Sequence, residues 1–171
     1  QEEVIEAYRN YEFHQIYQKI HNFCSVDLGA FYLDVLKDRL YTTPAQSHAR
    51  RSAQSAMYII IQAMARWLAP LLSFTAEEIW KYMPHGANDT AESVFLTTWL
   101  PLREAAKPTV DWTQLLELRG AVSRELEKLR VAGSIGAPLD ASVTLYANAA
   151  TYKLLSEFGD ELRFVFITSE A

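Results

Sequence analysis

Cysteine is almost absent from this sequence of 171 residues, which contains only Cys24. A lone cysteine excludes an internal disulfide and is typical of a reducing compartment, so we expect a cytoplasmic location. The four histidines and this cysteine follow no metal-ligand spacing, and we expect no metal in these residues. The chain has no run of about 18 uncharged apolar residues, so we expect no membrane-spanning segment.

The sequence also lacks the signatures of the common active sites. Residues 133–136 (GSIG) match neither a P-loop nor a dinucleotide fingerprint. No Ser/His/Asp order or Cys/His signature stands out. Glu77 and Glu78 are adjacent, so on a helix they face different directions and form no carboxylate pair. We therefore expect no catalytic residue in this chain.

Charge is distributed unevenly, although the whole chain carries a net charge of −5. Residues 37–66 contain five basic side chains and one acid, a net charge of +4. A basic segment on an acidic protein can still bind phosphate, because steering depends on the local potential. The alternative is a solvated helix face, and the charges taken alone favour that alternative.

Apolar side chains recur at helical spacing through the first half of the chain. This spacing predicts three successive helices, over residues 3–24, 28–40 and 47–69. We expect Asp27 to cap the second helix and Pro44 to end it. Residues 75–78 (TAEE) form a capping box, with Thr75 as the cap of a fourth helix that continues to about Met83. Four helices with short connections predict an antiparallel helical bundle.

The second half changes character after residue 84, where Pro, Gly and Asn mark a loop. We expect residues 95–99 to be extended. We then expect a helix over residues 111–131, a strand over 142–147, a helix over 149–158 capped by Asn148, and a strand over 162–168. This order predicts a small α/β subdomain. The expected fold class is mainly α, with a helical-bundle domain over residues 1–105 and the α/β subdomain over 106–171.

Two of the expected helices carry side chains suited to RNA. The candidates are Lys37, Arg39, Arg50, Arg51, Gln54 and Tyr58. Lys and Arg neutralise phosphates and release counterions, while Gln can bond base edges and Tyr can stack on an exposed base. Two alternatives stay open. The cations near residue 40 would also stabilise a helix C-terminus, and the arginine pair could bind acids such as Asp34 or Glu12.

Four segments of the chain resemble one family of enzymes. They are residues 31–58 (FYLDVLKDRLYTTPAQSHARRSAQSAMY), 68–80 (LAPLLSFTAEEIW), 135–147 (IGAPLDASVTLYA) and 159–169 (GDELRFVFITS). Together they are similar to the class I aminoacyl-tRNA synthetases of bacterial type. The second segment is shared with the valine- and leucine-specific members, whereas the others are similar to the isoleucine-specific members in particular. The resemblance covers nearly the whole chain.

The resemblance implies an anticodon-binding domain that holds the anticodon stem-loop of an isoleucine tRNA. The chain would be a fragment of a longer, monomeric synthetase that joins isoleucine to tRNA in two ATP-dependent steps. The family's HIGH and KMSKS signatures are absent here. No cofactor is therefore expected in this fragment, and ATP, Mg and zinc would belong to the rest of the synthetase chain. The alternatives are a valyl or leucyl anticodon-binding domain, or a helical protein-interaction module without an RNA role.

Overall fold

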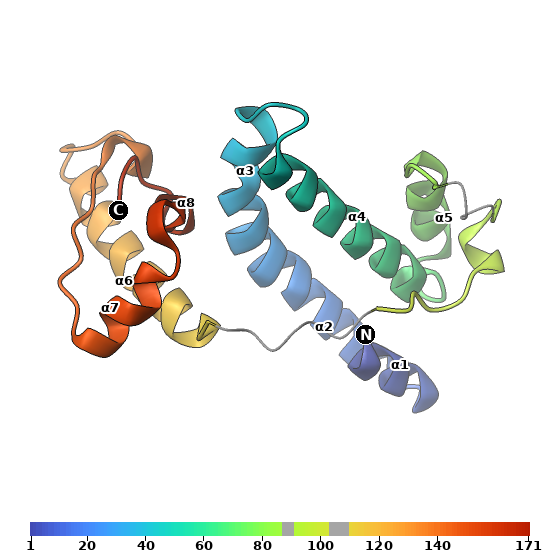
Figure 1. The fold of residues 1–171 in the computed structure, drawn as a ribbon. Helices are drawn as coiled ribbons and strands as arrows, with labels where there is room; N and C mark the ends of the chain where they lie inside the picture. Colours follow the sequence, from blue (N-terminus) through green and yellow to red (C-terminus); the bar gives the residue numbers. More distant parts are fainter. Residues whose placement is uncertain (87–90, 103–109) are drawn as a thin grey trace. The chain divides into compact units, whose positions relative to one another are not determined.

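The computed structural model describes residues 1–86, 91–102 and 110–171. The described part of the chain is mainly α-helical (Figure 1). It divides into two compact units, Gln1–Arg103 and Glu104–Ala171. The expectation of a mainly α fold is confirmed.

The first unit begins with two helices, α1 (Glu2–Arg9) and α2 (Phe13–Asn22). The expectation of one helix over residues 3–24 is wrong, because the chain turns sharply between them. Tyr11 adopts a left-handed φ of 57°, and the amide of Glu12 donates to the carbonyl of Ala7 at 2.8 Å. The turn folds α1 against α2, so that Val4 and Ile16 are buried in one cluster.

Helix α2 continues without interruption into a π-helical segment, η1 (Phe23–Tyr32), and then into α3 (Leu33–Tyr41). The expected cap at Asp27 is therefore wrong, because the amides near this residue lie inside a continuous helix and need no cap. A Cβ added to Gly29 would lie 3.0 Å from the carbonyl oxygen of Cys24, five residues earlier. The glycine permits this close approach within the wider π-helical turn.

Helix α4 (His48–Leu68) returns antiparallel to this long helix (Figure 1). Its first turn is capped by Ser47, whose Oγ accepts a hydrogen bond from the Arg50 amide at 3.3 Å. Small residues such as Ala53 and Ala63 are buried, which allows other helices to approach closely. The expectation of a helix over residues 47–69 is confirmed.

Helix α5 (Ser73–Tyr82) begins earlier than its sequence pattern predicts. The expectation of a capping box at Thr75 is wrong. Thr75 lies inside the helix, and Leu72 occupies the cap position without a side-chain hydrogen bond. The chain stays hydrogen-bonded as it leaves α4, with the Leu72 amide donating to the Leu68 carbonyl at 2.7 Å. This hydrogen-bonded turn starts α5 before the expected box.

A short 3-10 turn, η2 (Val94–Leu96), packs against α4 and α5. The expectation of an extended segment over residues 95–99 is therefore wrong at its start, and the chain becomes extended only from Thr97. Val94 joins Trp80 and Met83 in the larger buried cluster of this unit. Burial of Val94 favours the turn over a continuous strand.

The second unit contains the long helix α6 (Trp112–Val131), the 3-10 turns η3 (Pro138–Asp140) and η4 (Gly159–Glu161), and the short helices α7 (Ala149–Ser156) and α8 (Leu162–Phe166). Asp111 caps α6 through the Gln114 amide at 3.1 Å, and Asn148 caps α7 through the Thr151 amide at 2.9 Å. Both expected helices and the Asn148 cap are confirmed.

The expectation of an α/β subdomain is wrong for the part of this unit that the structure describes. Residues 142–147 form only an isolated parallel bridge, between Ser142 and Glu170. Residues 162–166 are helical, because Leu162, Val165 and Phe166 are buried at helical spacing. Helix α8 then ends at Ile167, whose left-handed φ of 57° prevents continuation as a strand.

Candidate nucleic-acid interface

The end of α3 presents one predicted cation directly to solvent. The side chain of Lys37 is 67% exposed, and its Nζ donates to Oδ1 of Asp34 at 2.7 Å. This hydrogen bond and the attraction of the same carboxylate raise the pKa of Lys37. Exposed ion pairs of this kind contribute little to stability, so Lys37 can exchange its partner for a phosphate.

Arg50 instead braces the turn between α3 and α4. The half-buried Arg50 donates from Nη1 to the carbonyl of Thr43 at 3.2 Å. Ser47 donates from its hydroxyl to Oγ1 of Thr43 at 3.1 Å. The Arg50 guanidinium therefore bonds a backbone carbonyl of its own turn, whereas the sequence had left open a bond to an acid such as Asp34 or Glu12. Arg50 supplies positive charge to this region from a fixed position.

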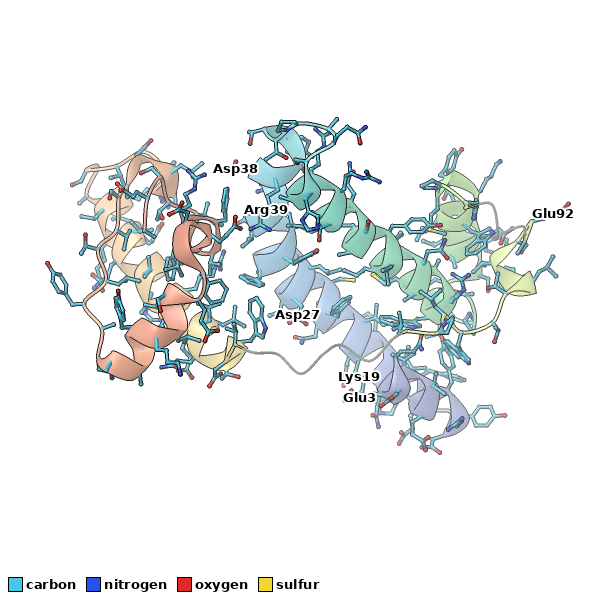
Figure 2. All side chains as sticks on the ribbon, in the orientation of Figure 1. Glu3, Lys19, Asp27, Asp38, Arg39 and Glu92 are labelled. Atoms are coloured by element: carbon cyan, nitrogen blue, oxygen red, sulfur yellow. The ribbon has the colours of Figure 1, made fainter. Side chains whose placement is uncertain are left out.

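Arg39 is also half-buried on α3, near the α3–α4 turn (Figure 2). Burial raises the pKa of the neighbouring Tyr32 phenol, and the positive charge of Arg39 opposes that rise. The guanidinium therefore lies close to the Tyr32 ring. Like Arg50, Arg39 contributes to the local potential while it packs within its own unit.

Three of the predicted residues line one shallow hollow beside α4. Arg51, Gln54 and Tyr58 share it with Ser55, Ile59 and Pro84, and its volume is about 540 Å³. Arg51 and Gln54 are exposed on the wall of this hollow. Tyr58 is half-buried against the Trp80 cluster, and its hydroxyl accepts a hydrogen bond from Nε2 of Gln62 at 2.8 Å. Packing therefore limits the ring surface that Tyr58 offers to a base.

This arrangement suits anion binding rather than acid-base chemistry. Lys37 and Arg51 offer exposed cationic donors, and Gln54 adds an amide that can donate and accept. Arg39 and Arg50 raise the local positive potential from half-buried positions. Such a combination can bind a phosphate backbone and contact a sugar or base edge.

The family of the anticodon-binding domain of tRNA ligase matches residues 1–145 of this chain. This match spans most of the sequence and includes every residue of the proposed interface. The chain belongs to this family.

Relatives of this anticodon-binding domain are isoleucine--tRNA ligases. The chain is 55% identical to the one from Nitrosococcus oceani and 57% identical to that from Methylococcus capsulatus, each over 176 aligned residues. It is 53% identical over 177 aligned residues to that from Legionella pneumophila (strain Corby). Each match covers 100% of the chain and 18% of the relative. The chain therefore spans about a fifth of the length of these relatives, and it corresponds to their anticodon-binding portion.

The described residues of this anticodon-binding domain also bear on metal binding and membrane insertion. They contain no group of three or more His, Cys, Asp or Glu side chains that could hold a metal ion. None of their helices is sufficiently long and apolar to cross a bilayer.

The sequence did not indicate the contacts of Glu77 or the exposure of Tyr41, and the structure shows both. Glu77 lies on α5 and accepts hydrogen bonds from the Ser93 hydroxyl at 2.8 Å and the Val94 amide at 3.1 Å. Tyr41 is the last residue of α3 and is 83% exposed. The sequence signal for Tyr41 was its position four residues after Lys37, which places both on one helix face.

Proposed function

We propose that this chain binds the anticodon stem-loop of an isoleucine tRNA through the end of α3 and the adjoining face of α4. The observation that carries the proposal is the coincidence of the family match with exposed cations on these helices. In this proposal Lys37, Arg51 and Gln54 contact the RNA directly. Arg39 and Arg50 strengthen the potential, and Tyr58 supports the wall of the hollow.

The parent protein would be an isoleucine--tRNA ligase, which attaches isoleucine to tRNA in two ATP-dependent steps. The residues of this chain would bind the stem-loop and thereby position the acceptor end for chemistry performed elsewhere. ATP, Mg and zinc would be held by residues of the parent outside this chain. The isoleucine-specific relatives, at 51–57% identity, support this proposal over a valyl or leucyl parent.

A second surface supports contact with the rest of the synthetase chain. The turn between α4 and α5 exposes Leu71 and Leu72, at 37% and 51%, and the first turn of α5 exposes Phe74, at 93%. Neighbouring apolar side chains in solvent are typical of a surface that another part of a protein covers. A protein-interaction module would show the same exposed apolar side chains. Measuring whether the chain binds RNA therefore decides between that module and an anticodon-binding function.

The test compares two lysines that form similar ion pairs, although Asp34 is 32% exposed and Glu125 is 70% exposed. Lys37 pairs with Asp34, and Lys128 pairs with Glu125. In each pair the residues are three apart in the sequence, and the lysine Nζ lies 2.7 Å from a carboxylate oxygen. The lysine side chains are 67% and 70% exposed, respectively. Binding of isoleucine tRNA by the chain is measured by anisotropy across a salt series. We expect Lys37→Ala to weaken binding and to reduce the slope of log affinity against log salt by about 1.

The matched variant Lys128→Ala should leave both the affinity and the slope unchanged. Equal effects of the two substitutions would contradict the assignment of the α3–α4 face. Wild-type chain that binds no tRNA, or binds it without salt dependence, would contradict RNA binding itself and favour the protein-interaction alternative.

A further inference from the structure

Tyr41 is an aromatic side chain presented to solvent at the end of α3. It is 83% exposed, so most of its ring faces solvent. Lys37 lies one turn earlier on the same helix face. Tyr41 is close enough to contribute to the raised pKa of Lys37, after the larger effects of Asp34. An open aromatic ring and an exposed cation therefore lie side by side.

Five other exposed aromatic residues differ from Tyr41. Three of them are partly covered: Tyr11 by Phe13, Tyr17 by His21 and Tyr82 by Lys81. Phe74 is 93% exposed, but Glu77 and Glu78 follow it one turn later, where they would repel a phosphate. Tyr146 is 97% exposed, but no cation occurs within four residues of it in the sequence.

The backbone that carries Tyr41 is held firmly. The hydroxyl of Thr42 donates to the carbonyl of Asp38 at 2.6 Å, and that of Thr43 donates to the carbonyl of Arg39 at 2.5 Å. Arg50 fixes the same turn through the Thr43 carbonyl. A ring on a fixed backbone loses little conformational freedom on binding, and Tyr has only two side-chain torsions to order.

We propose that Tyr41 is a stacking platform for an unpaired base of the RNA loop, with Lys37 holding an adjacent phosphate. The inference rests on the proposed RNA binding of the α3–α4 face and assigns a ligand class to one further residue. Unpaired loop bases expose their faces to aromatic side chains, whereas bases stacked within a duplex do not. Stacking tolerates any base, so Tyr41 would contribute affinity for a loop rather than sequence discrimination.

The experiment uses the full chain and two RNA probes. One is the anticodon stem-loop of an isoleucine tRNA, and the other is the same stem as a blunt duplex without a loop. We expect Tyr41→Ala to weaken stem-loop binding about tenfold, within the range that one stacked base supplies, and to leave duplex binding unchanged. Tyr41→Phe and Tyr41→Trp should bind the stem-loop as the wild type does. Phe74→Ala is the matched control, because it removes a similarly exposed ring, 93% against 83%, from an acidic neighbourhood.

Two further measurements separate stacking from a structural role. Tyr41→Ala should keep the salt slope of the wild type, because an uncharged ring releases no counterion, whereas Lys37→Ala should reduce it by about 1. A stem-loop that carries 2-aminopurine in place of a loop purine should lose fluorescence on binding the wild type. That loss should be smaller with Tyr41→Ala and should return with Tyr41→Trp.

The outcomes distinguish this inference from the function on which it rests. Wild type that binds neither probe would overturn both. Wild type that binds the stem-loop with normal salt dependence, while Tyr41→Ala binds equally well, would overturn the stacking platform alone. An equal loss of stem-loop and duplex binding in Tyr41→Ala would also overturn it, since loss of the fold would then explain the defect.

Discussion

The guanidinium carbon of Arg66 lies 4.7 Å from the ring centroid of Trp80. Trp80 is buried, and its indole Nε1 donates to the carbonyl of Ala91 at 3.0 Å. Arg66 also donates from Nε to the carbonyl of Thr98 at 3.0 Å. This stacked pair therefore joins α4 and α5 to the segment around η2, and it engages the Arg66 guanidinium within its own unit.

The stacked pair predicts that Arg66 cannot be replaced by another cation. Arg66→Lys keeps the charge but loses the planar group that stacks on Trp80 and bonds Thr98. We expect Arg66→Lys to lower the free energy of unfolding by about 1–2 kcal/mol, and Trp80→Ala by about 3–5 kcal/mol. Urea denaturation measures both. An unfolding midpoint of Arg66→Lys equal to that of the wild type would contradict the role of the stacked pair.

The adjacent arginines predict opposite phenotypes. Arg50→Ala removes the bond to the Thr43 carbonyl and should lower the free energy of unfolding by about 1 kcal/mol. The exposed Arg51 should tolerate alanine within about 0.5 kcal/mol, while its loss weakens tRNA binding and reduces the salt slope. Denaturation curves and anisotropy on the same two variants check this separation. Equal stability losses would show that Arg51 also braces the fold.

A second matched pair lies on α5, where Glu77 bonds the η2 turn and the adjacent Glu78 is exposed. We expect Glu77→Ala to lower the free energy of unfolding by about 1.5–3 kcal/mol, because hydrogen bonds to a carboxylate are the stronger ones. Glu78→Ala should stay within about 0.5 kcal/mol. Hydrogen exchange provides the local measurement. The Val94 amide should exchange faster in Glu77→Ala only, and unchanged protection there would count against the tether.

Tyr8 predicts a loss of stability at high pH. Burial raises the pKa of Tyr8 to about 12, and its hydroxyl donates to the carbonyl of Trp67 at 2.6 Å. Folding therefore favours the neutral phenol. This contribution is complete below the unfolded-state pKa of about 10 and is lost as pH rises toward 12.

Absorbance titration tests the Tyr8 prediction. At about pH 11 the folded wild type and Tyr8→Phe should contain nearly equal numbers of phenolates, since Tyr8 remains protonated there. In urea at the same pH, the wild type should contain one phenolate more. A folded wild type that already shows this additional phenolate would mean that Tyr8 titrates normally.

The two long helices α4 and α6 were predictable from sequence. Residues 47–69 combine a serine cap with a sustained apolar stripe, and the structure has α4 over nearly the same residues. Short segments were not predictable, because a brief apolar run fits a strand or a helix equally well. Residues 162–168 are rich in β-branched and aromatic side chains. Packing of Leu162, Val165 and Phe166 nevertheless favours a helix. In addition, Arg119 donates a hydrogen bond from Nε to the Val165 carbonyl at 2.9 Å.

The sequence predicts which types of residue form the candidate interface, but it does not predict the role of each residue. The sequence identifies Arg50 and Arg51 as one basic pair, yet one braces a turn and the other lies in solvent. That difference depends on where the Thr43 carbonyl points, which is set by the geometry of the α3–α4 turn. The ring of Tyr41 was missed for a related reason, because its exposure follows from where α3 ends. Whether these residues contact RNA stays a prediction.

The unbroken helix from Phe13 to Tyr41 sets the rotational phase between its two ends. Each residue of the α-helical parts turns the chain by about 100°, and each residue of the wider π-helical segment turns it by less, so the direction in which Lys37 faces is fixed by the number of residues that separate it from Ile16. Insertion or removal of one residue in η1 would rotate the cationic end about the helix axis, while the core around Ile16 stayed packed. Length variation in this segment would therefore redirect the α3 end without changing any residue that lies on it.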